Sequence, residues 1–235
     1  TKCGLSWDDS ASKTVISRLK KDSVRREVEA SLKRLNIDQI DLYQMHWPDP
    51  DEDIEEAWEE MARIKGEGLV RYIGVSNFSV TQMKRASKIH EIASLQPPYS
   101  MLRRDFETAE LAWCRDNNVG VIPYSPMQAG LLTGAFSTER LASLPSGDWR
   151  HKSEYFQQPA FSRHLETVEL LKPLASTLGA SLAELAIAWT LRDPAVTSAI
   201  VGARHPDQLE GTIGGADIEL EKSTIDEIDT VLSRA

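Results

Sequence analysis

Three observations on the sequence predict an α/β fold built on parallel strands. Short, mostly apolar segments alternate with amphipathic helical patterns along the 235 residues. No G-x-G-x-x-G motif follows an apolar segment, which disfavours an open dinucleotide-binding sheet. Polar side chains occur just after the apolar segments, where the strands of a parallel barrel carry active-site residues. We therefore predict a (β/α)8 barrel that forms a single domain over residues 1–235.

The predicted strands are short and apolar, as expected for strands that are buried on both faces. They cover residues 40–46, 70–75, 93–96, 119–124 and 198–202, with a short stub at Thr1-Lys2. A closed barrel of this kind needs eight strands. The sequence therefore predicts that the first two βα units of the barrel are absent from these residues.

Residues suited to helix ends mark the predicted helices. Asp22 or Ser23 is expected to cap the first helix, whose apolar positions recur at helical spacing from 24 to 35. Gly66 and Gly68 are expected to end the second helix. The later signals are an N-terminal cap at Ser79, a capping box at Ser181 and Glu184, and a first-turn proline at Pro206. Further helices are predicted over 106–114 and 224–232.

Residues 127–162 have little regular hydrophobic pattern and contain several Gly, Pro, Ser and aromatic residues. Unpatterned segments of this length in compact domains are usually functional lids or disordered. This segment follows the predicted strand that ends at Tyr124. We therefore predict a long loop that lies over the site.

Composition and charge argue against a nucleic-acid or membrane protein. The net charge is −9, and the densest basic cluster, RLKK at 18–21, is short and typical of a solvated helix start. No apolar run reaches membrane-spanning length, and no signal peptide is visible. Cys3 and Cys114 form no C-x-x-C motif, so we interpret them as packing residues in a reducing, cytoplasmic protein. The sequence does not determine the oligomeric state.

Five stretches of the chain together resemble a known family. They are DLYQMHWP (41–48), IGVSNF (73–78), QPPYS (96–100), YSP with GLLTG (124–126 and 130–134), and VGAR with Pro206, Gln208 and Leu209 (201–204 onward). In this order they resemble the aldo-keto reductases, nearest the short-loop bacterial and plant-type subfamily. The opening residues, Thr1 to Gly4, resemble the third strand of that barrel. The resemblance implies NADPH-dependent reduction of aldehydes or ketones to alcohols.

The resemblance assigns catalytic roles to two residues. Lys2 would lower the pKa of the catalytic tyrosine, and His46 would orient the substrate carbonyl. The family's tyrosine and aspartate precede the third strand and have no counterpart here. The alternatives are an exposed lysine, and a core or metal-ligating histidine; no metal is predicted, because no second His or Cys lies at ligand spacing. Trp7 and Trp47 follow strand ends and would line the substrate pocket, with core or loop packing as the alternative.

Four polar and aromatic residues would hold the nicotinamide end of the cofactor. Ser76, Asn77 and Gln96 offer the donors and acceptors that a carboxamide needs. The alternative for these residues is turn and helix-cap chemistry. Tyr124 would stack on the nicotinamide ring, with core packing as the alternative.

Ser125, Leu131 and Gly134 fall in the segment that resembles the pyrophosphate-contacting loop of the family. Small residues there let backbone N–H groups approach phosphate oxygens. The alternative is an ordinary glycine-containing loop.

The adenosine end of the cofactor is assigned to Gly202, Arg204 and Gln208. A guanidinium near a helix N-terminus suits the 2′-phosphate of NADPH. The sequence departs from the family at Gly211 and Thr212, where close relatives usually carry a Glu and an Asn that contact the adenosine. We therefore expect weaker binding of the adenine.

Two other functions remain open at this point. The first is a non-catalytic NADPH-binding regulatory or sensor protein of the same fold. The second is an unrelated barrel enzyme, such as a hydrolase or lyase, with paired carboxylates or a metal at its strand ends. Asp49, Asp51 and Asp53 follow one strand, but they lie in a single acidic loop that is typical of solvated surface.

Overall fold

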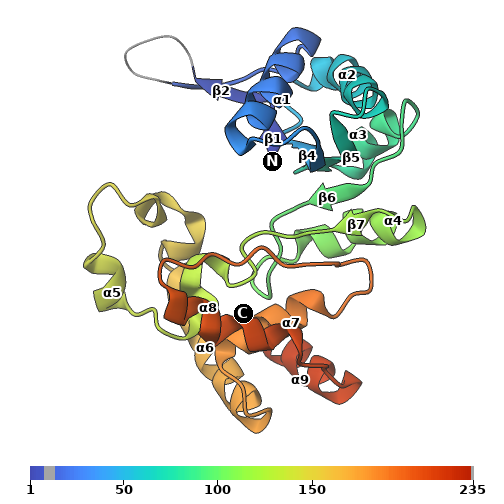
Figure 1. The fold of residues 1–235 in the computed structure, drawn as a ribbon. Coiled ribbons are helices and arrows are strands. Elements are labelled where there is room, and N and C mark those ends of the chain that lie inside the picture. Colours follow the sequence, from blue (N-terminus) through green and yellow to red (C-terminus); the bar gives the residue numbers. More distant parts are fainter. Residues whose placement is uncertain (8–13, 234–235) are drawn as a thin grey trace. The chain divides into compact units, whose positions relative to one another are not determined.

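The computed structural model describes residues 1–7 and 14–233, and Figure 1 shows their fold. Contacts within the chain divide it into two compact units. Unit 1 comprises Thr1–Pro97 and Phe106–Ile122, and unit 2 comprises Pro98–Asp105 and Pro123–Ala235. Unit 1 holds the parallel sheet, and unit 2 holds the C-terminal helices.

A five-stranded parallel sheet forms the centre of unit 1, with its strands in chain order β1-β4-β5-β6-β7. The strands are β1 (Lys2–Cys3), β4 (Ile40–Met45), β5 (Val70–Ser76), β6 (Ser94–Gln96) and β7 (Gly120–Val121). Each parallel neighbour follows the last one along the chain, which confirms the predicted βα alternation. The sheet of the described residues is open rather than closed into a barrel.

Strand β7 is shorter than the predicted strand at 119–124. The Ile122 N–H still donates to the Leu95 carbonyl at 3.0 Å, so the ladder to β6 runs one residue past the strand. The next donor in a parallel ladder would be the backbone nitrogen of residue 97. That residue is Pro97, which has no N–H, so one hydrogen bond is missing and the strand is interrupted. Pairing resumes as a single parallel bridge between Pro98 and Tyr124, where the Tyr99 N–H donates to the Tyr124 carbonyl at 3.1 Å.

The predicted strand at 198–202 is wrong. In its place, a single parallel bridge joins Ile200 to Tyr124, with the Ile200 N–H donating to the Pro123 carbonyl at 2.8 Å. Pro123 cannot donate to this neighbour, so the ladder cannot extend toward the start of the segment. Ser125 has a left-handed backbone with φ of 60° rather than an extended one, so the ladder cannot continue past Tyr124 and Ile200 either.

Helices cover the strands of unit 1, and a hairpin that the sequence pattern did not predict precedes them. The hairpin pairs β2 (Leu5–Trp7) with β3 (Val15–Ser17) in antiparallel register. The helical elements are α1 (Lys21–Leu35), η1 (Asp51–Asp53), α2 (Ile54–Gly66), α3 (Val80–Ala86), η2 (Asp105–Glu107) and α4 (Glu110–Asp116). The apolar side of α2, with Trp58 and Met61 fully buried, packs against the core.

Helix α1 begins earlier than predicted. Asp22 and Ser23 lie within its first turn, and Lys20 occupies the cap position without a side-chain cap hydrogen bond. The first-turn N–H of Lys21 instead donates to the carboxylate of Glu56 in α2 at 3.4 Å. A tertiary contact therefore replaces the local cap that the sequence predicted.

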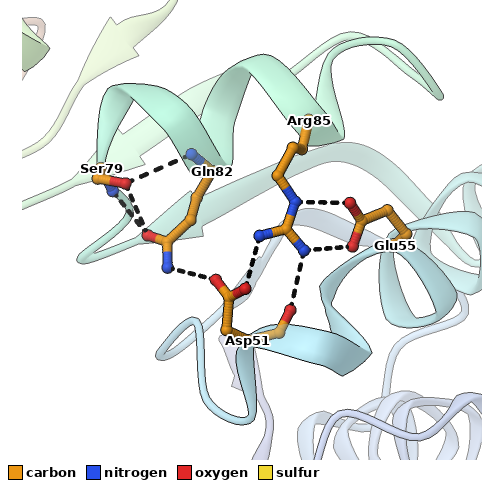
Figure 2. A network of polar contacts seen from close by, with 5 residues as sticks. All are labelled: Asp51, Glu55, Ser79, Gln82 and Arg85. Atoms are coloured by element: carbon orange, nitrogen blue, oxygen red, sulfur yellow. Dashed lines mark hydrogen bonds and ion pairs between the residues drawn. The ribbon is translucent and has the colours of Figure 1, made fainter.

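The predicted cap of α3 is confirmed, and it is part of a wider polar network (Figure 2). The Gln82 N–H donates to Ser79 Oγ at 3.3 Å, and the Ser79 N–H donates back to Gln82 Oε1 at 2.9 Å. Gln82 Nε2 also donates to Asp51 at 2.9 Å. Arg85 donates to Asp51 and to both carboxylate oxygens of Glu55, each at 2.6 Å. Exposed pairs of this kind stabilise weakly one by one, but together they orient α3 relative to α2.

Unit 2 contains α6, α7 and the shorter elements around them. They are η3 (Gln128–Thr133), α5 (Thr138–Ala142), η4 (Trp149–Lys152), η5 (Glu154–Phe156), α6 (Ala160–Thr177), α7 (Leu182–Leu191), α8 (Pro206–Ile213), η6 (Gly214–Ala216) and α9 (Lys222–Leu232). The predicted capping box of α7 and the proline at the start of α8 are confirmed.

The segment at 127–162, predicted as a long loop, is instead a series of short helical turns. Leu131, Phe156 and Phe161 are buried together at its centre. Aromatic contacts continue this packing, with the rings of Phe136 and Phe156 centred 5.1 Å apart. The aromatic residues that broke the hydrophobic periodicity therefore form a small core.

Among the described residues, no single helix is long and apolar enough to cross a membrane. Helices α6 and α7 meet the length and composition requirement only when taken together, and they are bent by 86° at the break between them.

Gly74 in β5 permits close packing at the centre of the sheet. A Cβ at this position would lie 2.2 Å from Ser94 Oγ and 2.8 Å from the Ser94 carbonyl oxygen. It would also lie 3.3 Å from the side chain of Gln44. The backbone of β6 cannot move away without breaking the ladder, so only glycine fits at this position.

We predict that Gly74→Ala lowers the free energy of unfolding by about 1–3 kcal/mol through overpacking. Gly66→Ala is the matched control, since a Cβ at the end of α2 meets nothing within 4 Å. That control should be neutral or stabilise the protein by about 0.5–1 kcal/mol. Urea denaturation followed by circular dichroism measures both, and equal stabilities for the two variants would contradict the prediction.

Candidate functional site

The predicted site residues of unit 1 gather at the carboxyl ends of its strands. Ser76 ends β5 directly beside Gln96, which ends β6. The Ser76 hydroxyl donates to the Gln96 carbonyl at 2.7 Å, and the Asn77 N–H donates to the same oxygen at 3.2 Å. Asn77 Nδ2 donates to the His46 carbonyl at 3.0 Å. Hydrogen bonds thus connect the ends of β4, β5 and β6.

Asn77 is the residue on which these contacts converge. Its φ of 61° lies in the left-handed region, which asparagine tolerates better than most residues. Its side chain also donates to Ser76 Oγ at 3.1 Å. If Asn77 only formed a turn, its hydrogen bonds would connect residues close together in the sequence. Its bond to His46 instead connects residues that are 31 positions apart. Asn77 therefore stabilises both the turn after β4 and the turn after β5, in which it lies.

Sequence reasoning missed Gln44, which lies buried in the middle of β4. Gln96 Nε2 donates to Gln44 Oε1 at 2.9 Å, and Gln44 Nε2 donates to Ser94 Oγ at 3.1 Å. The sequence feature that could have identified Gln44 is a polar residue inside an apolar strand. Gln44 lies two positions before His46, which places both residues on the same side of the sheet. This buried chain of amides fixes the orientation of the Gln96 side chain.

Lys2 and His46 are half-buried, and the charge of Lys2 acts on His46. Burial lowers the pKa of Lys2. Burial, and then the positive charge of Lys2, lower the pKa of His46. The imidazole is therefore neutral near neutral pH, and in that form one ring nitrogen donates while the other accepts a hydrogen bond.

The two tryptophans predicted for the substrate pocket differ in their surroundings. Trp47 is 43% exposed and stacks on His46 with ring centroids 6.4 Å apart. Trp7 is 66% exposed on the β2–β3 hairpin. Only Trp47 is thus seen next to a candidate catalytic side chain. Cys3 and Cys114 are both buried, as predicted for packing residues.

Tyr124 and Ser125 lie in unit 2, at the bridge that replaces the predicted last strand. The ring of Tyr124 is half-buried, so part of it remains open to a ligand. Burial raises the pKa of Tyr124, and the positive charge of Arg103 opposes that rise. Ser125 is exposed, and its left-handed backbone turns the chain into η3.

The predicted phosphate-contacting loop is η3 and the turn that follows it. Leu131 is fully buried in the small core, so only its backbone can face a ligand. Gly134 ends η3 with φ of 72°, and a Cβ there would lie 3.0 Å from the Lys172 side chain. The positive φ favours glycine here, whereas the end of the flexible Lys172 side chain could move away from a Cβ.

Gly202, Arg204 and Gln208 are exposed in the segment that leads into α8. The Arg204 N–H donates to Gln208 Oε1 at 2.7 Å, which holds this segment against the first turn of the helix. The hydroxyl of Thr212 donates to the Gln208 carbonyl at 3.0 Å, so this side chain is used within the helix. Nothing lies within 4 Å of a Cβ at Gly211. The weaker adenosine contact expected at Gly211 and Thr212 stays a prediction.

In the part of the chain that the structure describes, no group of three or more His, Cys, Asp or Glu side chains is arranged to hold a metal ion. The strand ends of unit 1 instead offer amide, hydroxyl, imidazole and ammonium groups. Such groups bind and orient a polar organic ligand through hydrogen bonds.

We predict that Lys2→Met raises the pKa of His46 toward its ordinary value, because the variant removes the adjacent positive charge. Lys33→Met removes an exposed charge from α1 and is the control, with no change expected. Titration of the imidazole proton resonances by NMR measures both. An unchanged His46 pKa in Lys2→Met would show that burial alone sets it.

Comparisons with known proteins agree with this arrangement. The model of the aldo/keto reductase family matches residues 1–233. The chain is 37% identical over 233 residues to aldo-keto reductase YhdN of Bacillus subtilis, covering 99% of this chain and 69% of that protein. It is 32% identical to the NADH-specific methylglyoxal reductase of Escherichia coli, covering 94% of this chain and 69% of that protein.

Among solved structures, the glycerol dehydrogenase AKR11B4 from Gluconobacter oxydans superposes with a TM-score of 0.93 at 33% identity. The match covers 100% of this chain and 71% of that chain. These matches confirm the predicted resemblance and the predicted barrel class of fold. The chain belongs to the aldo/keto reductase family of oxidoreductases.

Proposed function

We propose that this chain carries the carbonyl-orienting and cofactor-binding residues of an NADPH-dependent reductase of aldehydes and ketones. The observation that carries the proposal is the set of hydrogen bonds at the ends of β4, β5 and β6, beside the Lys2 and His46 pair. A reducing, cytoplasmic setting fits two buried cysteines that are not in a disulfide.

The residues of unit 1 fit a carbonyl substrate. Neutral His46 would donate a hydrogen bond to the carbonyl oxygen and orient it. The ammonium of Lys2 would stabilise negative charge that develops on that oxygen or on a neighbouring phenol. The bound cofactor supplies the hydride that the carbonyl carbon receives.

The ends of β5 and β6 also fit the carboxamide of a nicotinamide. Such an amide needs both a donor and an acceptor, and Asn77, Ser76 and Gln96 provide both kinds of atom. The bond from Gln96 to Gln44 orients the Gln96 amide before any ligand binds. In unit 2, considered by itself, Tyr124 has a partly open ring that could stack on an aromatic ligand.

The preference for NADPH is proposed from Arg204. Arg204 lies two residues before Pro206, the first residue of α8, and a positive charge and a helix N-terminus both favour a phosphate dianion. The Escherichia coli relative carries the name of an NADH-specific enzyme, so membership of the family does not decide the cofactor.

We predict that the protein binds NADPH more tightly than NADH, and that Arg204→Gln weakens NADPH binding by about tenfold or more. NADH lacks the 2′-phosphate, so its affinity should not change. Arg163→Gln removes an exposed charge elsewhere in unit 2 and should change neither. Titration of cofactor fluorescence measures the affinity of the unaltered protein, of Arg204→Gln and of Arg163→Gln for each cofactor.

Equal binding of NADH and NADPH by the unaltered protein would contradict the NADPH proposal. Failure to bind either cofactor would contradict the reductase proposal as a whole. With binding established, the loss of NADPH absorbance in the presence of small aldehydes and ketones tests the reaction itself.

A further inference from the structure

Gln44 connects two strands of unit 1 that are not neighbours in the sheet. The register pairs Gln44 with Gly74 and Gly74 with Ser94, so only a residue without a side chain separates Gln44 from Ser94. The Gln44 amide crosses this gap: its Nε2 donates to Ser94 Oγ at 3.1 Å, and its Oε1 accepts from Gln96 Nε2 at 2.9 Å. One side chain of β4 thus holds two side chains of β6.

Burial gives these hydrogen bonds their importance. Gln44 is 3% exposed, and Ser94 and Gln96 are each 6% exposed. Water does not readily replace a lost partner at such depth, so an unpaired amide is costly there. Gln96 can meet Gln44 Oε1 only with its nitrogen, because two amide oxygens repel each other. Gln44 therefore decides which end of the Gln96 amide turns away from it.

The end that turns away is Gln96 Oε1. Within residues 1–7 and 14–233, this oxygen accepts no hydrogen bond. It is also not one of the fully buried polar atoms that lack a partner in these residues, so it remains accessible from outside. The Gln96 carbonyl is fixed separately by the Ser76 hydroxyl and the Asn77 N–H. The strand end therefore offers an acceptor in a fixed position.

The neighbouring side chains use their donor hydrogens within the protein. The Ser76 hydroxyl donates to the Gln96 carbonyl, and the two hydrogens of Asn77 Nδ2 go to the His46 carbonyl and to Ser76 Oγ. A donor on a ligand accordingly gains more at this strand end than an acceptor does. The nicotinamide carboxamide carries such a donor in its NH2 group.

We propose that Gln44 is a positioning residue that holds the Gln96 amide with its oxygen toward the ligand, so that the site selects the NH2 group of a carboxamide. Gln44 touches Gln96 and Ser94, not the ligand. The proposal rests on the proposed reductase function and adds a residue to which the family resemblance gives no role. All of the residues involved belong to unit 1.

A purely structural role for Gln44 would be to fill the space above Gly74. Methionine has nearly the same length as glutamine and would keep that role, but it has no amide to hold Gln96. Gln44→Met therefore separates the two roles. Gln39→Met is the matched control, since Gln39 lies exposed just before β4 and its Nε2 donates to the Gly68 carbonyl at 2.8 Å.

The first measurement uses NADP⁺ and its 3-acetylpyridine analogue, in which a methyl group replaces the NH2 group and the carbonyl is kept. The unaltered protein should bind NADP⁺ about tenfold more tightly by calorimetry, because the methyl group leaves Gln96 Oε1 unpaired. Gln44→Met should reduce this preference to about threefold or less, because the amide is no longer held. Gln39→Met should keep the preference of the unaltered protein.

Two further variants test the orientation of the amide. Gln44→Glu places a carboxylate beside Lys2, whose charge favours the ionised form. A carboxylate still accepts from Gln96 Nε2, so this variant should keep the preference. Ser94→Ala removes only the far partner of Gln44 and should lower the preference by less than Gln44→Met does. If thermal unfolding shows that Gln44→Met is not folded, Ser94→Ala decides in its place.

The second measurement needs no cofactor. Hydrogen exchange of the Gln96 side-chain amide, followed by NMR, reports whether the group is held in the ligand-free protein. Exchange should be at least about tenfold faster in Gln44→Met, because the hydrogen bond to Oε1 is lost. It should be unchanged in Gln39→Met. Unchanged protection in a folded Gln44→Met variant would overturn the proposal.

A preference that falls in Gln44→Met and stays in Gln44→Glu supports the proposal. A preference that survives Gln44→Met, or that falls equally in both variants, would overturn it and leave Gln44 a packing residue. Equal binding of NADP⁺ and the analogue by the unaltered protein would also overturn it, with the proposed function intact. Failure to bind either compound would overturn the proposed function, and the role of Gln44 in cofactor selection with it.

Discussion

Parallel pairing of β4, β5 and β6 is the constraint on which the candidate site of unit 1 depends. Side chains alternate along a strand, so the register decides which polar groups meet. Pairing of Gly74 with Ser94 leaves room for the amide of Gln44 to reach both Ser94 and Gln96. A one-residue slip would turn these amides to the opposite face of the sheet and separate Ser76 from Gln96.

Buried polar groups at the strand ends also set the chemistry of their neighbours. Asn77 holds the carbonyl of His46, which keeps that residue at the end of β4. Burial and the charge of Lys2 then favour the neutral imidazole. A neutral histidine next to a cation donates a hydrogen bond without adding a second positive charge, which suits the binding of a polarised carbonyl.

Prolines interrupt the ladders after β6 and β7, and irregular backbone follows them. Pro97 interrupts the pairing that follows β6 and β7, which resumes only as the Pro98–Tyr124 bridge, and Pro123 limits the pairing with Ile200 to a single bridge. Backbone released from the ladders forms the turn that presents Arg103 and the left-handed turn at Ser125. Interrupted pairing thus leaves short strands in unit 1 and irregular backbone at Ser100–Arg103 and Ser125.

The sequence by itself determined the features that depend on a few consecutive residues. These are the alternation of strands and helices, the caps at Ser79 and Ser181, and the polar residues Ser76 and Gln96 that end β5 and β6. Tertiary structure alone decided the features that need a distant partner: the contact of Glu56 with the start of α1, the role of Gln44, and the single bridge at Ile200. Local propensity acts through neighbours within a turn, whereas burial and hydrogen-bond pairing depend on residues that only the fold brings together.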